Sequence, residues 1–516
     1  MSVWERELDE AGLARLAQLA ALATRPGDVL ALSGALGAGK STFARAFIRA
    51  LLDDPDAEVP SPTFTLQQDY RTRVGRVAHA DLYRLADAGE AAELDFADAP
   101  SETVALIEWP ERASRLLPPD RFEIGLEIAG SGTRRRVSLR GHGSCAPRAA
   151  RIGDIFTFLD GLPAWRTASV THLQGDASTR SYARLVGEPG SAVLMDAPRQ
   201  ADGPPIRNGL AYSRIACLAE DVRPFVAIDL TLRDKGFSAP DILAADLERG
   251  FLLLEDLGRR SFGAEIESGA PQLELWRAAV DVLIALRASP PPVRMPLPDG
   301  STYTLPRRDR AAFEIETELL LDWLWPALKG SPPSEDVREE FRALWSPVID
   351  RLLNLPGGWF LRDYHSPNLF WLPDRSGTSR VGLLDFQDAL NESFTFDLVC
   401  VLQDARVDVP EAIERSLRDA YCATVAEREP GFDRAAFDAA YADFGAQRNT
   451  RLLGLWARLL IRDGKPNYLR HLPRTWQYLE RNLAHPGLAP VRRWFDRNFP
   501  AEIRRRSLDW TRSAGA

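Results

Sequence analysis

Residues 33–42 read SGALGAGKST, and this motif indicates the fold of the segment that contains it. It satisfies the pattern G-x-x-x-x-G-K-[ST], which forms a phosphate-binding loop when it lies between a strand and a helix. The apolar run that ends at Gly34 predicts a short strand, and the helical spacing after Lys40 predicts a helix. The sequence therefore predicts an α/β domain with a site for nucleotide phosphates.

The residue types of this loop have separate roles. Glycines let backbone N–H groups wrap the phosphates, and the N-terminus of the following helix adds its dipole. The lysine reaches the β- and γ-phosphate oxygens, and the serine hydroxyl is a Mg²⁺ ligand. We expect ATP to be bound here by Gly34, Gly37, Ala38, Gly39, Lys40, Ser41 and Thr42, with Ser41 also on the metal.

Length and composition limit the classes of protein to consider. A chain of 516 residues is too long for one hydrophobic core, so two or three domains are expected. The net charge of −9 argues against broad attraction to a polyanion. The four cysteines are scattered without a CxxC pair, no export signal is visible, and no run of about 18 apolar residues occurs. We expect a cytoplasmic protein that makes no use of a membrane.

Composition along the chain suggests where the domains divide. The opening segment predicts a helix, and apolar runs at 104–109 and 122–128 predict strands, so residues 1–140 form the first domain. Gly, Ser, Pro and Arg residues at 141–151 predict a linker, whose arginines are either solvated or in contact with RNA. A small sheet-containing lobe (152–258) and a larger helical lobe (259–516) are expected after it.

Three further motifs surround the phosphate loop: VPSPTFTLQQDY (59–70), HADLYRL (79–85) and LIEWPER (106–112). Together with the loop they resemble the TsaE family, also called YjeE, an ATPase that supports formation of threonylcarbamoyladenosine (t6A) on tRNA. The resemblance implies that Thr63 lies near the metal and that Asp81 and Glu108 serve hydrolysis, Glu108 also as a metal ligand. It also implies partners like TsaB and TsaD, and leaves direct tRNA contact open. Taken alone, Asp81 would more often be a helix cap or a surface ion-pair partner, and Glu108 a solvated strand end.

A second phosphate signature follows in the stretch FLRDYHSPNLFWL (360–372). The spacing from Asp363 to Asn368 is that of a kinase catalytic loop, in which the aspartate orients the acceptor hydroxyl or takes its proton and the asparagine holds Mg²⁺. Asp385 follows an apolar strand in GLLDFQDAL and supplies a second metal ligand. The alternative for Asp363 is a turn aspartate that caps a helix.

The segments GDASTRSY, LRDYHSPNL, LLDFQD and RDGKPNYL resemble the aminoglycoside-phosphotransferase-like kinases, most closely the AmgK branch. That branch phosphorylates the anomeric hydroxyl of N-acetylmuramate and N-acetylglucosamine in cell-wall recycling. Together, the TsaE resemblance and this one imply an α/β P-loop NTPase domain followed by an α+β bilobal kinase-like (aminoglycoside phosphotransferase) domain. Asp363 is then the catalytic base, and Asn368 and Asp385 bind Mg²⁺. Ser178, Thr179 and Arg180 are expected at the ATP phosphates.

Two residues depart from the kinase pattern. Leu361 stands where the family usually has a histidine that braces the loop, and Met195 where many kinases have a phosphate-binding lysine. Two alternatives therefore stay open: a catalytically dead kinase-like scaffold, or a kinase for another alcohol such as an aminoglycoside, a choline-like alcohol or homoserine. Asp397 is expected to cap or brace a helix.

Overall fold

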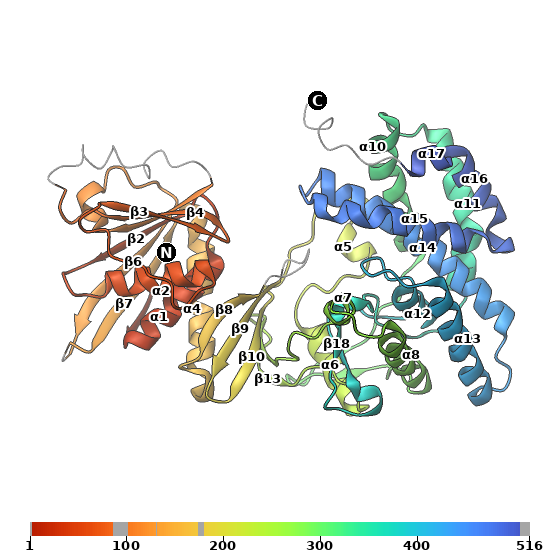
Figure 1. The fold of residues 1–516 in the computed structure, drawn as a ribbon, viewed down its shortest axis with the longest axis horizontal. Coiled ribbons are helices and arrows are strands. Elements are labelled where there is room, and N and C mark those ends of the chain that lie inside the picture. Colours follow the sequence, from red (N-terminus) through yellow and green to blue (C-terminus); the bar gives the residue numbers. More distant parts are fainter. Residues whose placement is uncertain (1–2, 86–101, 131, 174–179, 506–516) are drawn as a thin grey trace. The chain divides into compact units, whose positions relative to one another are not determined.

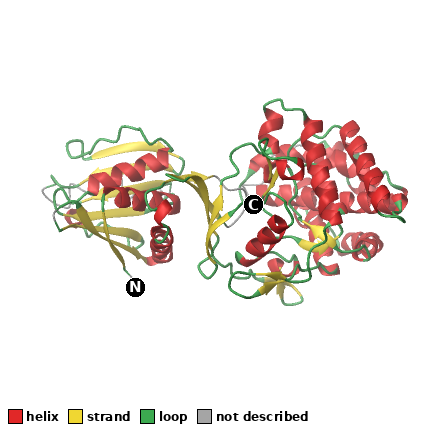
Figure 2. Cartoon of the chain, turned by 90° about the horizontal axis from the view of Figure 1, so that it is seen from below, coloured by secondary structure: helices red, strands yellow, loops and turns green. Residues whose placement is uncertain are grey.

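The computed structural model describes residues 3–85, 102–130, 132–173 and 180–505. The chain divides into two compact units, the first formed by residues 1–198 and 241–256 and the second by residues 199–240 and 257–516. Figure 2 shows that strands dominate the first unit and helices the second. The chain passes from one unit to the other next to 258, where the sequence predicts a boundary between lobes.

A seven-stranded sheet forms the N-terminal part of the first unit, in the order β1-β7-β6-β2-β5-β4-β3 (Figure 1). Its strands are β1 (Trp4–Leu8), β2 (Val29–Gly34), β3 (Gln67–Thr72), β4 (Gly75–Asp81), β5 (Thr103–Glu108), β6 (Arg121–Ala129) and β7 (Arg134–His142). Strand β2 runs parallel to β5 and β6, and β4 runs parallel to β5. The carboxyl ends of β2, β4 and β5 therefore meet at one edge of the sheet.

The first described residues form a strand, so the predicted opening helix is wrong at its start. Strand β1 pairs antiparallel with β7, and Trp4 lies opposite Leu139. Helix α1 (Glu10–Ala23) begins only after Asp9, whose carboxylate accepts a hydrogen bond of 2.8 Å from the backbone N of Gly12. The prediction fails because pairing with β7 is a contact between residues far apart in the sequence.

Helix α2 (Lys40–Leu52) begins directly at the phosphate loop, as the sequence predicts. Its apolar residues recur at helical spacing, and Phe43, Phe47 and Leu51 are fully buried. The helix packs on α1, and both contribute to one core with the sheet. This burial holds the helix N-terminus at the end of β2, where a bound phosphate needs it.

Residues 141–151, for which the sequence predicts a linker, are mostly helix and strand. They contain the end of β7, a 3-10 turn and the start of helix α4 (Ala146–Asp160). The side chains of Ala149, Ile152 and Phe156 are buried along one face of α4. Apolar residues recur here at helical spacing, which indicates a helix face. The many Gly, Ser and Arg residues between them obscure this pattern in the sequence. The division into domains at this point stays a prediction.

A second sheet completes the first unit, in the order β13-β14-β10-β9-β8. Its strands are β8 (Ser169–Leu173), β9 (Ser181–Gly187), β10 (Gly190–Asp196), β13 (Ile242–Asp246) and β14 (Phe251–Glu255). One continuous buried cluster joins this sheet to α1, α2 and α4. The backbone N of Val170 donates a hydrogen bond of 3.0 Å to Gln18 Oε1, which ties β8 to α1. The two sheets are thus parts of one packed body.

Gly153 is a point of close approach within this shared core. A Cβ atom at this position would lie 2.6 Å from Cδ1 of Trp4, whose ring also packs on Phe156. We expect Gly153→Ala to lower the free energy of unfolding by about 1–3 kcal/mol through overpacking, measured by denaturant titration. Gly203→Ala is the control, since a Cβ atom there would meet nothing within 4 Å. Equal stability of the two variants would contradict the tight contact.

The second unit is mainly helical (Figure 1). Its helices are α5 (Tyr212–Ile215), α6 (Arg223–Asp234), α7 (Phe262–Glu267), α8 (Gln272–Ala288), α9 (Arg310–Leu319), α10 (Trp325–Lys329), α11 (Glu335–Leu353), α12 (Thr395–Leu402), α13 (Glu411–Arg428), α14 (Arg434–Ile461), α15 (Leu472–Leu483), α16 (Ala489–Asn498) and α17 (Ala501–Arg504). Its short strands are β11 (Pro205–Arg207), β12 (Leu210–Ala211), β15 (Met295–Pro296), β16 (Thr302–Tyr303), β17 (Gly358–Phe360), β18 (Leu369–Trp371), β19 (Val381–Leu383) and β20 (Leu390–Glu392). Helix α14 packs against α9, α12 and α15 and forms the centre of the unit.

A buried ionic network fixes the loops around β17 and β20. Arg308 lies 2.8 Å from Glu316 and 2.8 Å from Glu392, and Arg362 donates a hydrogen bond of 3.3 Å to Glu316. Burial alone would raise the pKa of Glu316, but the charges of the arginines hold it down to about 2. Removing one partner of such a set leaves an uncompensated buried charge, which is strongly destabilising. The network therefore favours one arrangement of these loops.

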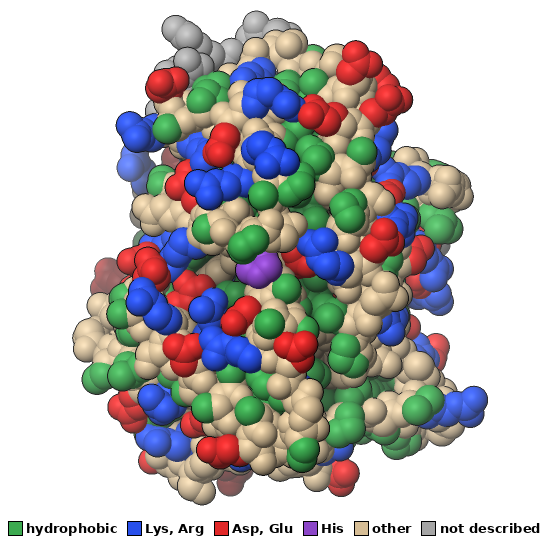
Figure 3. Space-filling view, turned by 90° about the vertical axis from the view of Figure 1, so that its right-hand side faces the viewer, with side chains coloured by type: hydrophobic (Ala, Val, Ile, Leu, Met, Phe, Trp, Pro, Cys, Tyr) green, Lys and Arg blue, Asp and Glu red, His purple; other side chains and the backbone are tan. Residues whose placement is uncertain are grey.

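The surface of the second unit carries charges of both signs. On the face that Figure 3 presents, Lys and Arg side chains alternate with Asp and Glu, and no broad area of one sign is seen there. Among the described residues, no helix is both long and apolar enough to cross a bilayer.

Candidate active sites

Three glycines of the phosphate loop have a positive φ, and two of them are tightly constrained. Gly34, at the end of β2, has φ 142°, and a Cβ atom there would lie 2.3 Å from the carbonyl oxygen of Leu126. Gly39 has φ 107° and precedes the first residue of α2. Both positions need glycine, because an L side chain rarely adopts this backbone and the space at Gly34 is filled. Gly37 also has a positive φ, of 77°.

Lys40 is held inside this loop. Its Nζ donates hydrogen bonds to the carbonyl oxygens of Gly34 (2.6 Å) and Ala35 (3.0 Å), and it lies 3.6 Å from the centroid of the Trp109 ring. Burial lowers the pKa of Lys40, while the charge of Glu108 opposes this shift. The ammonium group is thus placed at the loop's centre, in reach of the position where the motif binds phosphate.

The sheet brings the predicted acids of this site together. In the parallel pair β4 and β5, Asp81 lies opposite Glu108. The hydroxyl of Ser41 donates a 3.0 Å hydrogen bond to Glu108 Oε2, and the hydroxyl of Thr63 donates one of 2.6 Å to Asp81 Oδ2. Residues from four separate motifs therefore meet at the edge where β2, β4 and β5 end. Ala38 is buried under the loop, and Thr42 lies in the first turn of α2.

His79 is a member of this site that the sequence reasoning did not assign. Its Nε2 lies 3.0 Å from Glu108 Oε1, and both side chains are almost fully buried. Since Glu108 Oε2 already accepts from Ser41, the two contacts fix the carboxylate on both sides. The only sequence signal was that His79 and Asp81 lie two residues apart on one strand, so that they share a face.

Arg135, in β7, also contacts the loop. Its Nε donates a 2.8 Å hydrogen bond to the carbonyl oxygen of Ala38, and its Nη2 donates one of 3.1 Å to that of Gly37. These carbonyls belong to the loop whose N–H groups the motif turns toward phosphate. Arg135 therefore positions the loop from outside, a role that its place in an arginine-rich strand could not reveal.

We expect Arg135→Ala to raise KM for ATP in the hydrolysis reaction about tenfold or more, because a charged donor to two carbonyls is lost. The measurement is the steady-state rate of ADP release at varied ATP. Arg136→Ala is the matched control: this neighbouring side chain is 60% exposed and its nearest acids lie 3.9 Å away. An unchanged KM in Arg135→Ala would contradict the positioning role.

In the second unit, the predicted kinase residues also come together. The amide Nδ2 of Asn368 donates hydrogen bonds to the carbonyl oxygen of Asp363 (2.9 Å) and to Asp385 Oδ2 (3.3 Å). Gln387 donates a 2.8 Å bond to the other Asp385 oxygen. The antiparallel pairing of β18 with β19 places the loop before β18 beside the loop after β19. Residues 363, 368 and 385 therefore form one cluster.

Asp363 is set apart electrostatically from ordinary surface carboxylates. Burial, together with the charge of Asp385, raises the pKa of Asp363 to about 6. Its side chain nevertheless keeps 35% of its surface exposed, so the carboxyl group is accessible to a ligand. A raised pKa with open access is the combination that a general base for a hydroxyl requires.

Asp397 holds the loop that carries Asp363. Its carboxylate accepts hydrogen bonds from the backbone N–H groups of Leu361 (2.5 Å) and Arg362 (3.0 Å), and Arg362 has a left-handed φ of 72°. Burial raises the pKa of Asp397 to about 7, and the two backbone donors oppose that shift. The prediction that Asp397 caps a helix is wrong, since its carboxylate holds the loop that carries Asp363. Leu361 is buried, so it supports the loop by packing.

The other residues named for the kinase-like part are Ser178, Thr179, Arg180 and Met195. Ser178 and Thr179 lie outside the described residues. Arg180 directly precedes β9 in the first unit, and Met195 is buried in β10. The predicted roles of Ser178, Thr179 and Arg180 in binding ATP stay predictions.

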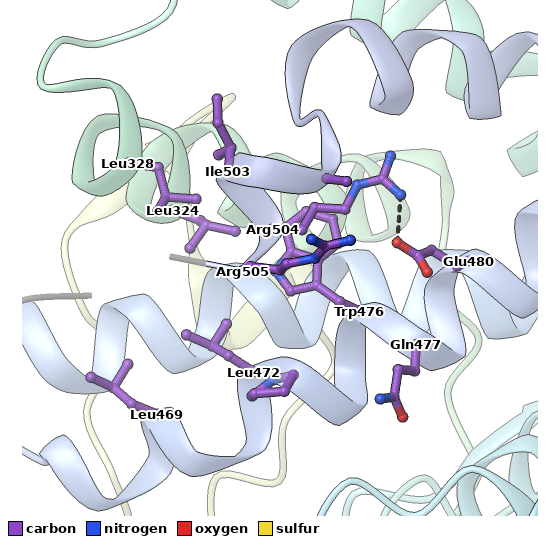
Figure 4. A pocket seen from close by; sticks show the side chains of 12 residues that line it. Leu324, Leu328, Leu469, Leu472, Trp476, Gln477, Glu480, Ile503, Arg504 and Arg505 are labelled. Carbon is purple, nitrogen blue, oxygen red and sulfur yellow. Dashed lines mark hydrogen bonds and ion pairs between the residues drawn. The ribbon is translucent and has the colours of Figure 1, made fainter. Parts of the chain in front are cut away.

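A cavity of about 600 Å³ lies elsewhere in the second unit, among α10, α15 and α17 (Figure 4). Leu324, Leu472 and Trp476 form part of its apolar wall, and Glu480 on its rim is bonded to Arg504 at 2.6 Å. None of the predicted site residues lines it. The predicted catalytic groups and this cavity are therefore separate features.

Comparison with known proteins finds a family for each part of the chain. The sequence model "Threonylcarbamoyl adenosine biosynthesis protein TsaE" matches residues 8–137, and the model "Phosphotransferase enzyme family" matches residues 169–438. TsaE of Rickettsia felis is 39% identical over 120 residues, which cover 23% of this chain and 70% of that protein. An N-acetylmuramate/N-acetylglucosamine kinase of Caulobacter vibrioides is 39% identical over 342 residues, 64% of this chain and 93% of that protein. The chain belongs to both families.

This TsaE–phosphotransferase fusion has further relatives along its second part. An N-acetylmuramate/N-acetylglucosamine kinase of Pseudomonas aeruginosa is 35% identical over 334 residues, 63% of this chain and 87% of that protein. Membership confirms the predicted fold class, a P-loop NTPase domain followed by a kinase-like domain. It also confirms the predicted enzyme class, a P-loop ATPase joined to a phosphotransferase, with ATP as the nucleotide of both parts.

Proposed function

We propose that this chain is a bifunctional enzyme. Its N-terminal part hydrolyses ATP in support of t6A formation on tRNA, and its C-terminal part transfers the γ-phosphoryl group of ATP to the anomeric hydroxyl of N-acetylmuramate or N-acetylglucosamine in cell-wall recycling. The observation that supports the second activity is the cluster of Asp363, Asn368 and Asp385. It lies in a chain that is 39% identical to a kinase for these sugars and covers 93% of the length of that kinase. A catalytically dead scaffold would have no need of this set.

Both sites fit Mg²⁺ by the chemistry of their donors. Mg²⁺ prefers oxygen ligands and is usually held by one or two carboxylates together with substrate phosphates. Asp385 and the amide oxygen of Asn368 supply such donors in the kinase site, and Glu108 with the hydroxyls of Ser41 and Thr63 supplies them in the ATPase site. When bound, the ion neutralises phosphate charge.

The chain's own groups perform the remaining tasks of phosphoryl transfer. Asp363, with its raised pKa and exposed carboxyl group, orients the sugar hydroxyl and takes its proton. Asp397 holds the backbone of Leu361 and Arg362, so that Asp363 keeps its position. Such positioning is the main protein contribution to phosphoryl transfer.

The ATPase site uses a different design. Backbone N–H groups of residues 34–40 and the ammonium of Lys40 bind the phosphates, while Asp81 and Glu108 orient the attacking water. The contacts of His79 and Ser41 with Glu108 keep this carboxylate in one orientation. We further propose TsaB- and TsaD-like proteins as partners of this part. A direct contact with tRNA is left to experiment.

The test uses the full-length protein with Mg²⁺ and ATP and a panel of acceptors: the two amino sugars, an aminoglycoside, choline and homoserine. We expect phosphate on the amino sugars alone, and ³¹P NMR of the product should show an anomeric phosphate. Phosphorylation of another alcohol in preference would contradict the sugar assignment. If no acceptor is used although ATP binds, the scaffold alternative is favoured.

A further inference from the structure

Two arginines of α14 lie on one face of the helix near the proposed kinase site. Arg451 and Arg458 are seven residues apart, close to two helical turns, and both are partly buried. Tyr212, at the start of α5, faces them: the Arg458 Cζ atom lies 5.7 Å from the centroid of its ring. Side chains from two elements of the second unit thus surround one position.

Part of each guanidinium group at this position has no hydrogen-bond partner among the described residues. Burial lowers the pKa of Arg458, Tyr212 opposes the shift, and the charges of Arg462 and Arg451 add to it. The buried Nε atoms of both Arg451 and Arg458 have no hydrogen-bond partner among the described residues. Asp463 acts on Arg458, but it is already bonded to Arg462 at 2.7 Å. Two guanidinium groups with unused Nε donors are the features of a site for an anion.

The nearest acids do not remove this charge. Glu316 acts on Arg451, yet it already lies 2.8 Å from Arg308 and 3.3 Å from Arg362. Glu316 also accepts a 2.9 Å hydrogen bond from Gln447, which lies one helical turn before Arg451 on α14, and Arg362 directly precedes Asp363 in the chain. This face of α14 is therefore directed toward Glu316 and the loop that carries Asp363, so an anionic group held by the pair can belong to the same ligand whose hydroxyl meets Asp363.

We propose that Arg451 and Arg458 bind the carboxylate of an acidic amino sugar and so set the preference of the kinase for N-acetylmuramate over N-acetylglucosamine. This inference rests on the proposed sugar-kinase function. N-acetylmuramate is N-acetylglucosamine with a lactyl ether that ends in a carboxylate, and the neutral sugar has no group for the pair. An arginine guanidinium matches a carboxylate with two parallel N–H donors.

The experiment compares kcat/KM of the full-length protein for the two sugars at saturating Mg²⁺–ATP. In Arg458→Gln we expect kcat/KM for N-acetylmuramate to fall about tenfold or more, which corresponds to the loss of a charge-assisted hydrogen bond. For N-acetylglucosamine it should change by less than about twofold, within the range of a surface substitution. The result is the ratio of kcat/KM for the two sugars, not either value alone.

Arg462→Gln is the matched control, because this nearby arginine is exposed and bonded to Asp463 at 2.7 Å; its ratio should equal that of the wild type. Arg458→Lys keeps the charge without the planar donor pair, so a smaller loss on the acidic sugar alone is expected. If Arg458→Gln does not fold, the ratio of kcat/KM for the two sugars in Arg458→Lys gives the result instead. An equal loss of kcat/KM on both sugars would place the pair at the transferred phosphoryl group and overturn the inference. An unchanged kcat/KM on both sugars would overturn it as well. Wild-type protein that phosphorylates neither sugar would overturn the proposed function as well.

Discussion

Replacing Asp363 by asparagine should lower the rate of sugar phosphorylation by about 10²-fold or more, the range found for loss of a positioned general base. The amide keeps the size of the carboxyl group but cannot take the proton of the sugar hydroxyl. Because Asn368 bonds to the backbone carbonyl of residue 363, the loop should keep its shape. The loss should therefore appear in kcat, with little change in KM for ATP.

The measurement is the initial rate of sugar phosphate formation at saturating substrates. Asp374→Asn serves as the control, since this aspartate is exposed in the same lobe. ATP hydrolysis in the absence of sugar should stay the same in both variants, because the P-loop site contains neither residue. Full kinase activity in Asp363→Asn would refute its assignment as the base.

Replacing Lys40 by alanine should reduce ATP hydrolysis without sugar by about 10²-fold or more, since preorganised charge at the phosphates is usually the largest catalytic contribution. In the structure Nζ is held in the loop by the carbonyls of Gly34 and Ala35, so its loss removes a positive charge from that point. Sugar phosphorylation should remain within about twofold of the wild type, since substitutions at sites that share no partners are nearly independent.

Both activities are measured on the same preparation, as ADP release without sugar and as sugar phosphate formed with it. Arg45→Ala is a suitable control because this side chain is exposed on the same helix. If Lys40→Ala lowered both activities equally, the two sites would not be independent. That result would direct attention to the core that α1, α2 and α4 share with the second sheet.

The phosphate loop was the most predictable part of the molecule. Its residues are contiguous, and the strand before Gly34 and the helix after Lys40 carry their own apolar patterns. The kinase cluster was predictable for a related reason, because Asp363 and Asn368 lie on one short loop and Asp385 follows the next strand but one. Order along the chain, together with the families it resembles, was enough to name these residues.

Other contributions had no local signal. Arg135 reaches the loop only because β7 lies two strands from β2 in the sheet, and Asp397 reaches the catalytic loop only because α12 packs beneath it. The strand at residues 4–8 likewise depends on a partner more than a hundred positions away. Neither periodicity nor spacing within a segment contains such information.

The two enzyme families, the fold class and the candidate catalytic groups could be predicted from the sequence, because each depends on residues close together in the chain. The folded structure was needed to show which side chains hold those groups in place, how the two sheets share one core, and that the Nε atoms of Arg451 and Arg458 have no partner among the described residues. These features arise from contacts between distant segments, whose pairing is decided when the whole chain buries its apolar surface.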